Sequence, residues 1–76
     1  MKFKKVSLEE LMNSYRESLG MVGAEKLIRQ TLFRAGLPYQ AEYSKEEALK
    51  ICRELKQYQG TIGVVGVILH SRITIR

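Results

Sequence analysis

The chain has 76 residues, a net charge of +5, 45% hydrophobic and 28% charged residues. This composition excludes an intrinsically disordered chain, and the length predicts one domain, residues 1–76. With one cysteine and one histidine, the chain forms neither an intrachain disulfide nor a zinc site of Cys and His ligands. A domain this short buries only about 60% of the surface that its unfolded chain exposes. Its stability must therefore come from helix packing or from oligomerisation.

Residues 1–6 are interpreted as a basic arm or a short strand. Serine and glutamate follow them instead of an apolar run, which argues against a secretory signal. The longest uncharged apolar stretch, residues 61–69, is about half as long as the ~20 residues that a membrane span needs. We therefore expect a cytoplasmic protein with no membrane partner.

Residues 7–59 predict three amphipathic helices. The first starts at Ser7, where Ser7 and Glu10 have the spacing of a capping box, in which each side chain bonds the other residue's backbone N–H. It ends at Gly20, because glycine tolerates the left-handed conformation that closes many helices. Its apolar residues recur at helical spacing. They are Leu8, Leu11, Met12, Tyr15 and Leu19.

The second predicted helix spans residues 22–35 and stops at Gly36, which is followed by Leu37 and Pro38. A loop over residues 37–43 comes next. Ser44 and Glu47 form a second capping box, which starts the third helix. The apolar positions of the last two helices form one stripe each. They are Ala24, Leu27, Ile28, Thr31, Leu32 and Ala35, then Ala48, Ile51, Cys52 and Leu55.

The C-terminal segment, residues 60–76, supports two interpretations. Its many Val, Ile and Thr residues favour a strand. Yet Ile62, Val65, Leu69 and Ile73 recur at helical spacing, so we favour a fourth helix. The predicted fold class is therefore all-α, a small bundle of three helices and this apolar segment. The alternative is α+β, with a C-terminal strand or a short terminal β-ribbon that pairs residues 72–76 with the start of the chain.

Three glycines recur at every third position in this segment, at Gly60, Gly63 and Gly66. The spacing fits neither a phosphate loop nor a dinucleotide-binding fingerprint. In a helix, small residues at this spacing let another backbone approach closely. We expect these glycines to mark a close packing contact.

The same segment predicts self-association. Three short helices can cover one side of it, and the opposite apolar side would stay exposed, which monomers generally avoid. A second copy covers such a side most simply with two-fold symmetry. The candidate homodimer interface consists of Ile62, Val64, Val65, Val67, Ile68, Leu69 and Ile73.

The net positive charge comes from the two ends of the sequence, because residues 6–71 hold as many basic as acidic side chains. If the ends meet in space, their cations form one basic patch that could bind nucleic-acid phosphates or an acidic protein. The candidate residues are Lys2, Lys4, Lys5, Arg72 and Arg76.

No residue pattern predicts catalysis, a metal site or a cofactor. Cys52 lies on an apolar stripe and is expected to be a buried, inert thiol, and His70 is expected at the surface. The favoured function is therefore a small non-enzymatic interaction or regulatory protein that acts as a homodimer. The alternative function is a nucleic-acid-binding module that uses the terminal basic patch.

Overall fold

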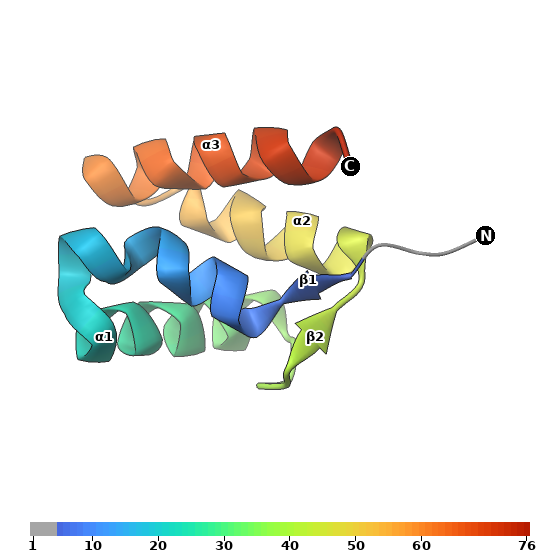
Figure 1. The fold of residues 1–76 in the computed structure, drawn as a ribbon, viewed down its shortest axis with the longest axis horizontal. Helices are drawn as coiled ribbons and strands as arrows, with labels where there is room; N and C mark the ends of the chain where they lie inside the picture. The colour runs from blue at the N-terminus through green and yellow to red at the C-terminus, as the bar shows by residue number, and fades with distance from the viewer. Residues whose placement is uncertain (1–4) are drawn as a thin grey trace.

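In the computed structural model, which describes residues 5–76, three helices and a small two-stranded sheet make up the fold (Figure 1). In chain order the elements are β1 (Val6–Ser7), α1 (Leu8–Ala35), β2 (Glu42–Tyr43), α2 (Lys45–Leu55) and α3 (Thr61–Thr74). The prediction of a small, mostly helical domain is confirmed. The predicted count of four helices is not confirmed, because the structure has three helices. The predicted all-α class omits the two-stranded sheet.

The two helices predicted before Gly36 are the arms of one kinked element, α1. Gly20, at the kink, has φ 74° and ψ 174°, a backbone conformation that is essentially restricted to glycine. The first arm comprises residues 8–19 and the second arm residues 21–35. The second arm folds back along the first (Figure 1), and Gly36 closes it in the left-handed conformation, φ 73°.

The sheet corrects one prediction and bears on the alternative fold. β1 pairs antiparallel with β2, Val6 opposite Tyr43 and Ser7 opposite Glu42, so part of the predicted loop over residues 37–43 is a strand. The alternative of a terminal ribbon is excluded for residues 72–74, which belong to α3. Residues 6–7 pair with the middle of the chain instead, and residues 1–4 lie outside the described part of the chain. Two-residue strands have no periodicity that a sequence could display, and this pairing joins residues far apart in sequence.

The C-terminal segment is helical from Thr61 to Thr74, which excludes the alternative of a strand over residues 72–76. The close packing expected at the glycines is confirmed for Gly63 and Gly66. A Cβ at position 63 would overlap the backbone carbonyl of Tyr58, and one at position 66 would lie 3.0 Å from backbone atoms of Leu55 and Lys56. α3 can therefore pack closely against the end of α2 and the turn that follows it.

The core lies among the three helices and the sheet. The predicted stripes supply most of it, and Tyr15 also donates a hydrogen bond from its hydroxyl to the Ile62 carbonyl, 2.8 Å away, which joins the first arm of α1 to the start of α3. The fully or almost fully buried apolar residues come from every element. They are Val6, Leu8, Leu11, Tyr15, Ala24, Leu27, Ile28, Leu32, Ala35, Tyr43, Ala48, Ile51, Cys52, Leu55, Leu69 and Ile73.

Candidate interaction surface

The side of α3 that faces away from the other helices is apolar and exposed. Val64, Val67 and Ile68 are 59%, 52% and 47% exposed, and they recur at positions i, i+3 and i+4 of the helix. Ile75, just after the end of α3, is 85% exposed and falls in register with Val64, since 11 residues are close to three turns. We call these four residues the outer face of α3.

The structure divides the seven predicted interface residues into three groups. Leu69 and Ile73 are fully buried in this chain's own core. Ile62 and Val65 are partly buried and pack against that core. The other three belong to the outer face of α3. Two of the predicted residues are therefore unavailable to a second copy, and the candidate surface narrows to the exposed side of the helix.

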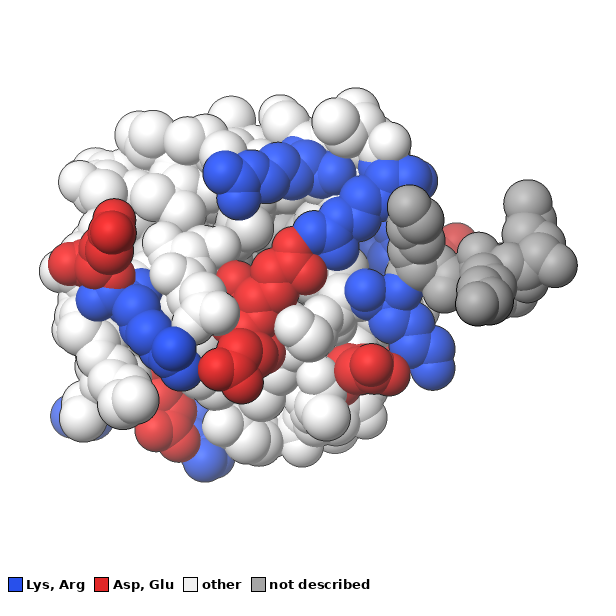
Figure 2. Space-filling model, in the orientation of Figure 1, with Lys and Arg blue, Asp and Glu red and all other residues white. Residues whose placement is uncertain are grey.

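α3 has no charged side chain on any side between Thr61 and Leu69. His70 follows, and its partial burial, together with the positive charges of Lys56 and Arg53, lowers its pKa below the ordinary value of 6.5. Near neutral pH its imidazole is therefore predominantly neutral, and the helix stays uncharged up to Arg72. The surface over the first half of α3 is correspondingly white in Figure 2.

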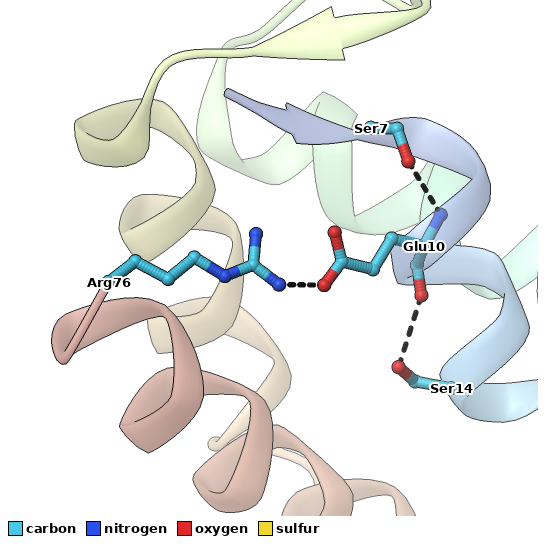
Figure 3. Close-up of polar contacts among 4 residues, drawn as sticks. All are labelled: Ser7, Glu10, Ser14 and Arg76. Atoms are coloured by element: carbon cyan, nitrogen blue, oxygen red, sulfur yellow. Dashed lines mark hydrogen bonds and ion pairs between the residues drawn. The ribbon is translucent and has the colours of Figure 1, made fainter. Parts of the chain in front are cut away.

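The basic residues at the end of the chain lie close to the start of α1. The Arg76 guanidinium forms an ion pair with the Glu10 carboxylate (Figure 3), and Lys45 Nζ donates to the Arg76 carbonyl at 3.3 Å. Arg72 lines a shallow polar groove together with Glu9 and Glu10. Blue and red atoms are therefore interleaved in this region of Figure 2.

Of the predicted patch, Lys5, Arg72 and Arg76 lie in the described part of the chain, whereas Lys2 and Lys4 lie outside it. Lys5 is exposed and directly precedes β1, so it belongs to the same end of the molecule. The carboxylate of Glu10 offsets the charge of Arg76, which weakens the patch as an anion site.

The Ser7 cap forms as predicted, but its capping box does not. The Ser7 hydroxyl accepts from the Glu10 N–H at 3.0 Å (Figure 3). The Glu10 side chain, instead of turning back to Ser7, points to Arg76. In the second box both bonds form: Ser44 Oγ accepts from the Glu47 N–H at 3.1 Å, and Glu47 Oε1 accepts from the Ser44 N–H at 2.9 Å.

Cys52 is fully buried, as predicted. Burial raises the pKa of its thiol to about 11, against a smaller opposing effect of Lys56. Burial is also the main cause that raises the pKa of Tyr15 above 10.0, and Cys52 and Tyr58 add to it. Near neutral pH these groups are protonated and their nucleophilicity is low.

Within residues 5–76 there is no group of three or more His, Cys, Asp or Glu side chains that could hold a metal ion. In the same part of the chain, no helix combines the length and the apolarity that crossing a lipid bilayer requires.

The sequence interpretation missed other exposed apolar residues on α1. Phe33 is 87% exposed, and Met21 and Val22 beside the kink are 68% and 69% exposed. A signal for Phe33 was present, because it falls outside the apolar stripe predicted for residues 22–35. Met21 and Val22 are exposed because of the sharp kink at Gly20. A glycine at that position does not by itself predict such a kink.

No protein-family model, curated protein or solved structure matches the chain significantly.

Proposed function

We propose that this chain is a small non-enzymatic interaction or regulatory protein that acts as a homodimer through the outer face of α3. The observation that carries the proposal is the contrast between the two sides of this helix. Its inner side is packed so closely that glycine is needed at Gly63 and Gly66. Its outer side exposes Val64, Val67 and Ile68 as an apolar stripe, which a soluble monomer would rarely leave uncovered.

A second copy suits this surface better than a charged partner does. The stripe has no charge to match, and a symmetric contact needs only self-complementary apolar side chains. The basic end of α3, with Arg72 and Arg76, favours an antiparallel arrangement, since a parallel pair would bring the four guanidiniums together. Antiparallel helices also oppose their dipoles favourably. The two-fold axis would then pass near Val67 and Ile68, at the middle of the helix.

The size of the surface sets the expected strength of the dimer. A helix of 14 residues is about 21 Å long and about 10 Å wide. Its outer face alone is smaller than the ~800 Å² per partner of a standard interface. The exposed apolar residues at the α1 kink lie at the same end as the start of α3 (Figure 1) and would add area. We therefore expect a dimer that dissociates on dilution.

Sedimentation velocity over a range of concentrations tests the proposal. Wild type should be dimeric at high micromolar concentration, and Val67→Glu should be monomeric with unchanged circular dichroism, because it places a charge in an apolar contact. Phe33→Glu is the matched control, since it places the same charge at an exposed apolar position on another helix, and it should remain dimeric. A wild type that stays monomeric, or a control that dissociates equally, would contradict the proposal.

A second proposal, nucleic-acid binding by the terminal basic patch, is supported by the approach of Arg76 to Glu10, which places the end of α3 near the start of α1. Replacing Lys2, Lys4, Lys5, Arg72 and Arg76 together by glutamine should then abolish binding and leave the fold intact. Wild-type affinity should fall steeply with salt. Absence of binding to duplex and single strands at low salt would end this proposal.

A further inference from the structure

The second arm of α1 presents an exposed aromatic ring among cations. Lys26, Arg29 and Phe33 recur at positions i, i+3 and i+7, which places them along one side of the helix. All three are exposed, Phe33 by 87%. Over residues 21–40 the sequence has three basic residues and one acid, Glu25. This segment of the chain therefore has a net charge of +2.

Aromatic rings contact the guanidiniums of both arginines in this segment, Arg29 and Arg34. The Arg29 guanidinium lies 4.1 Å from the centre of the Tyr39 ring and also pairs with Glu25, 3.0 Å away. The Arg34 guanidinium lies 5.3 Å from the centre of the Tyr58 ring. Such contacts reduce the freedom of the long arginine side chains, so less of it is lost on binding. We call this surface the basic–aromatic stripe, which consists of Lys26, Arg29, Phe33 and Tyr39, together with Arg34, which follows Phe33 on the adjoining side of the helix.

We propose that the basic–aromatic stripe binds single-stranded nucleic acid. Phosphates would contact the cations, and an unpaired base would stack on the free ring of Phe33. Proteins that bind single strands combine a positive surface with aromatic stacking platforms, and stacking tolerates any sequence because every base has a π-face. An acidic peptide would use the charges alone and leave the exposed ring without a role. A duplex keeps its bases stacked on one another, so it offers none to Phe33.

This site is separate from the terminal basic patch. There, Glu10 pairs with Arg76, and Glu9 and Glu10 line the groove beside Arg72. The second arm of α1 lies at the opposite edge of the molecule from α3 (Figure 1). The inference therefore goes beyond the proposed homodimer and holds for a monomer or a dimer alike.

Fluorescence anisotropy with a labelled oligothymidylate of about 15 nucleotides, titrated at several salt concentrations, tests the inference. Phe33→Ala should weaken binding roughly tenfold and leave the salt dependence unchanged, because it removes stacking and no charge. Arg34→Gln should lower the slope of log K against log salt by about 0.7, as expected for one lost phosphate contact on a single strand. Met21→Ala, an exposed apolar truncation elsewhere on α1, should bind like wild type.

Four results would overturn the inference. They are no binding at about 50 mM salt, equal affinity in wild type and Phe33→Ala, a larger loss in Arg72→Gln than in Arg34→Gln, and displacement of the oligonucleotide by polyglutamate as efficiently as by unlabelled oligothymidylate. The third result would assign binding to the terminal basic patch. The fourth would assign the stripe to an acidic protein.

Discussion

Glu10 illustrates what a local motif can and cannot predict. The sequence places it correctly for a capping box with Ser7, and the Ser7 half of that box forms. The other half does not form, because the Glu10 carboxylate bonds Arg76, which is 66 residues away in the sequence. Both bonds are charge-assisted, but the pair with Arg76 also brings two opposite charges together. Local spacing therefore predicts the cap but not the long-range competitor.

The complete capping box at Ser44 gives the first prediction at the residue scale. Ser44→Ala should lower the free energy of unfolding by about 1 kcal/mol, because the Glu47 N–H loses its acceptor at the start of α2. Urea denaturation measures the loss. Ser18→Ala is the matched control, since Ser18 is exposed and starts no helix, and it should change stability little. Equal stability of Ser44→Ala and wild type would show that the cap does not hold α2.

The buried thiol of Cys52 gives the second prediction at the residue scale. Its pKa of about 11 in the folded chain exceeds the value of about 8.5 expected when unfolded. The folded state therefore keeps a proton that the unfolded state releases, so this contribution to stability is complete below about pH 8.5 and is lost as the pH rises toward 11.

We expect the free energy of unfolding to fall across this range in wild type and to fall less steeply in Cys52→Ala. In the variant, the free energy of unfolding should still fall with rising pH, in part because the raised pKa of Tyr15 acts in the same direction. Urea denaturation at several alkaline pH values measures both slopes. Identical slopes, or rapid modification of the native thiol at pH about 8, would show that Cys52 is not buried as described.

At the scale of elements, α3 shows how packing decides between two local preferences. Its Val, Ile and Thr residues favour a strand, and Gly63 and Gly66 each cost a helix about 1 kcal/mol relative to alanine. The helix forms because the missing side chains let it pack closely against the end of α2. The glycine spacing predicts a close contact, but the sequence does not say which element makes it.

Gly63→Ala tests that contact. Alanine improves helix propensity, yet its Cβ would overlap the Tyr58 carbonyl, which is backbone and cannot move aside freely. We expect a net loss of about 2 kcal/mol in the free energy of unfolding. Gly66→Ala, whose Cβ would lie 3.0 Å from its nearest neighbours, should cost less. A variant at Gly63 that is as stable as wild type would show that α3 does not need this approach.

The other elements divide in the same way. The apolar stripes, both serine caps and the stop at Gly36 were predictable, because helical periodicity and capping chemistry lie within a few residues of one another. The sheet was not, since Val6 pairs with Tyr43 across the whole of α1. The kink was predictable as a helix end at Gly20, but not as a sharp reversal within one element.

At the scale of the whole molecule, the sequence of the C-terminal segment predicts more apolar surface than the core of one chain can cover. The structure places Leu69 and Ile73 in the core and leaves Val64, Val67 and Ile68 exposed. The sequence could show that the segment is apolar on all sides. It could not show which side faces inward, because that depends on the packing of Gly66 against the end of α2 and of Gly63 against the turn that follows it.

Cysteine cross-linking tests the geometry of the proposed dimer. In an antiparallel pair centred on the middle of α3, residue 67 faces its own copy, whereas residue 64 lies about 5 Å from the axis along the helix and so about 10 Å from its copy. A disulfide requires Cα atoms no more than about 7 Å apart. In a Cys52→Ala background, mild oxidation should therefore link Val67→Cys to itself and leave Val64→Cys largely unlinked. Phe33→Cys, on another helix, should also stay monomeric on a non-reducing gel. Equal linking at 64 and 67 would indicate a parallel pair, and equal linking at all three positions would mean random collision, which would remove the support for an interface on α3.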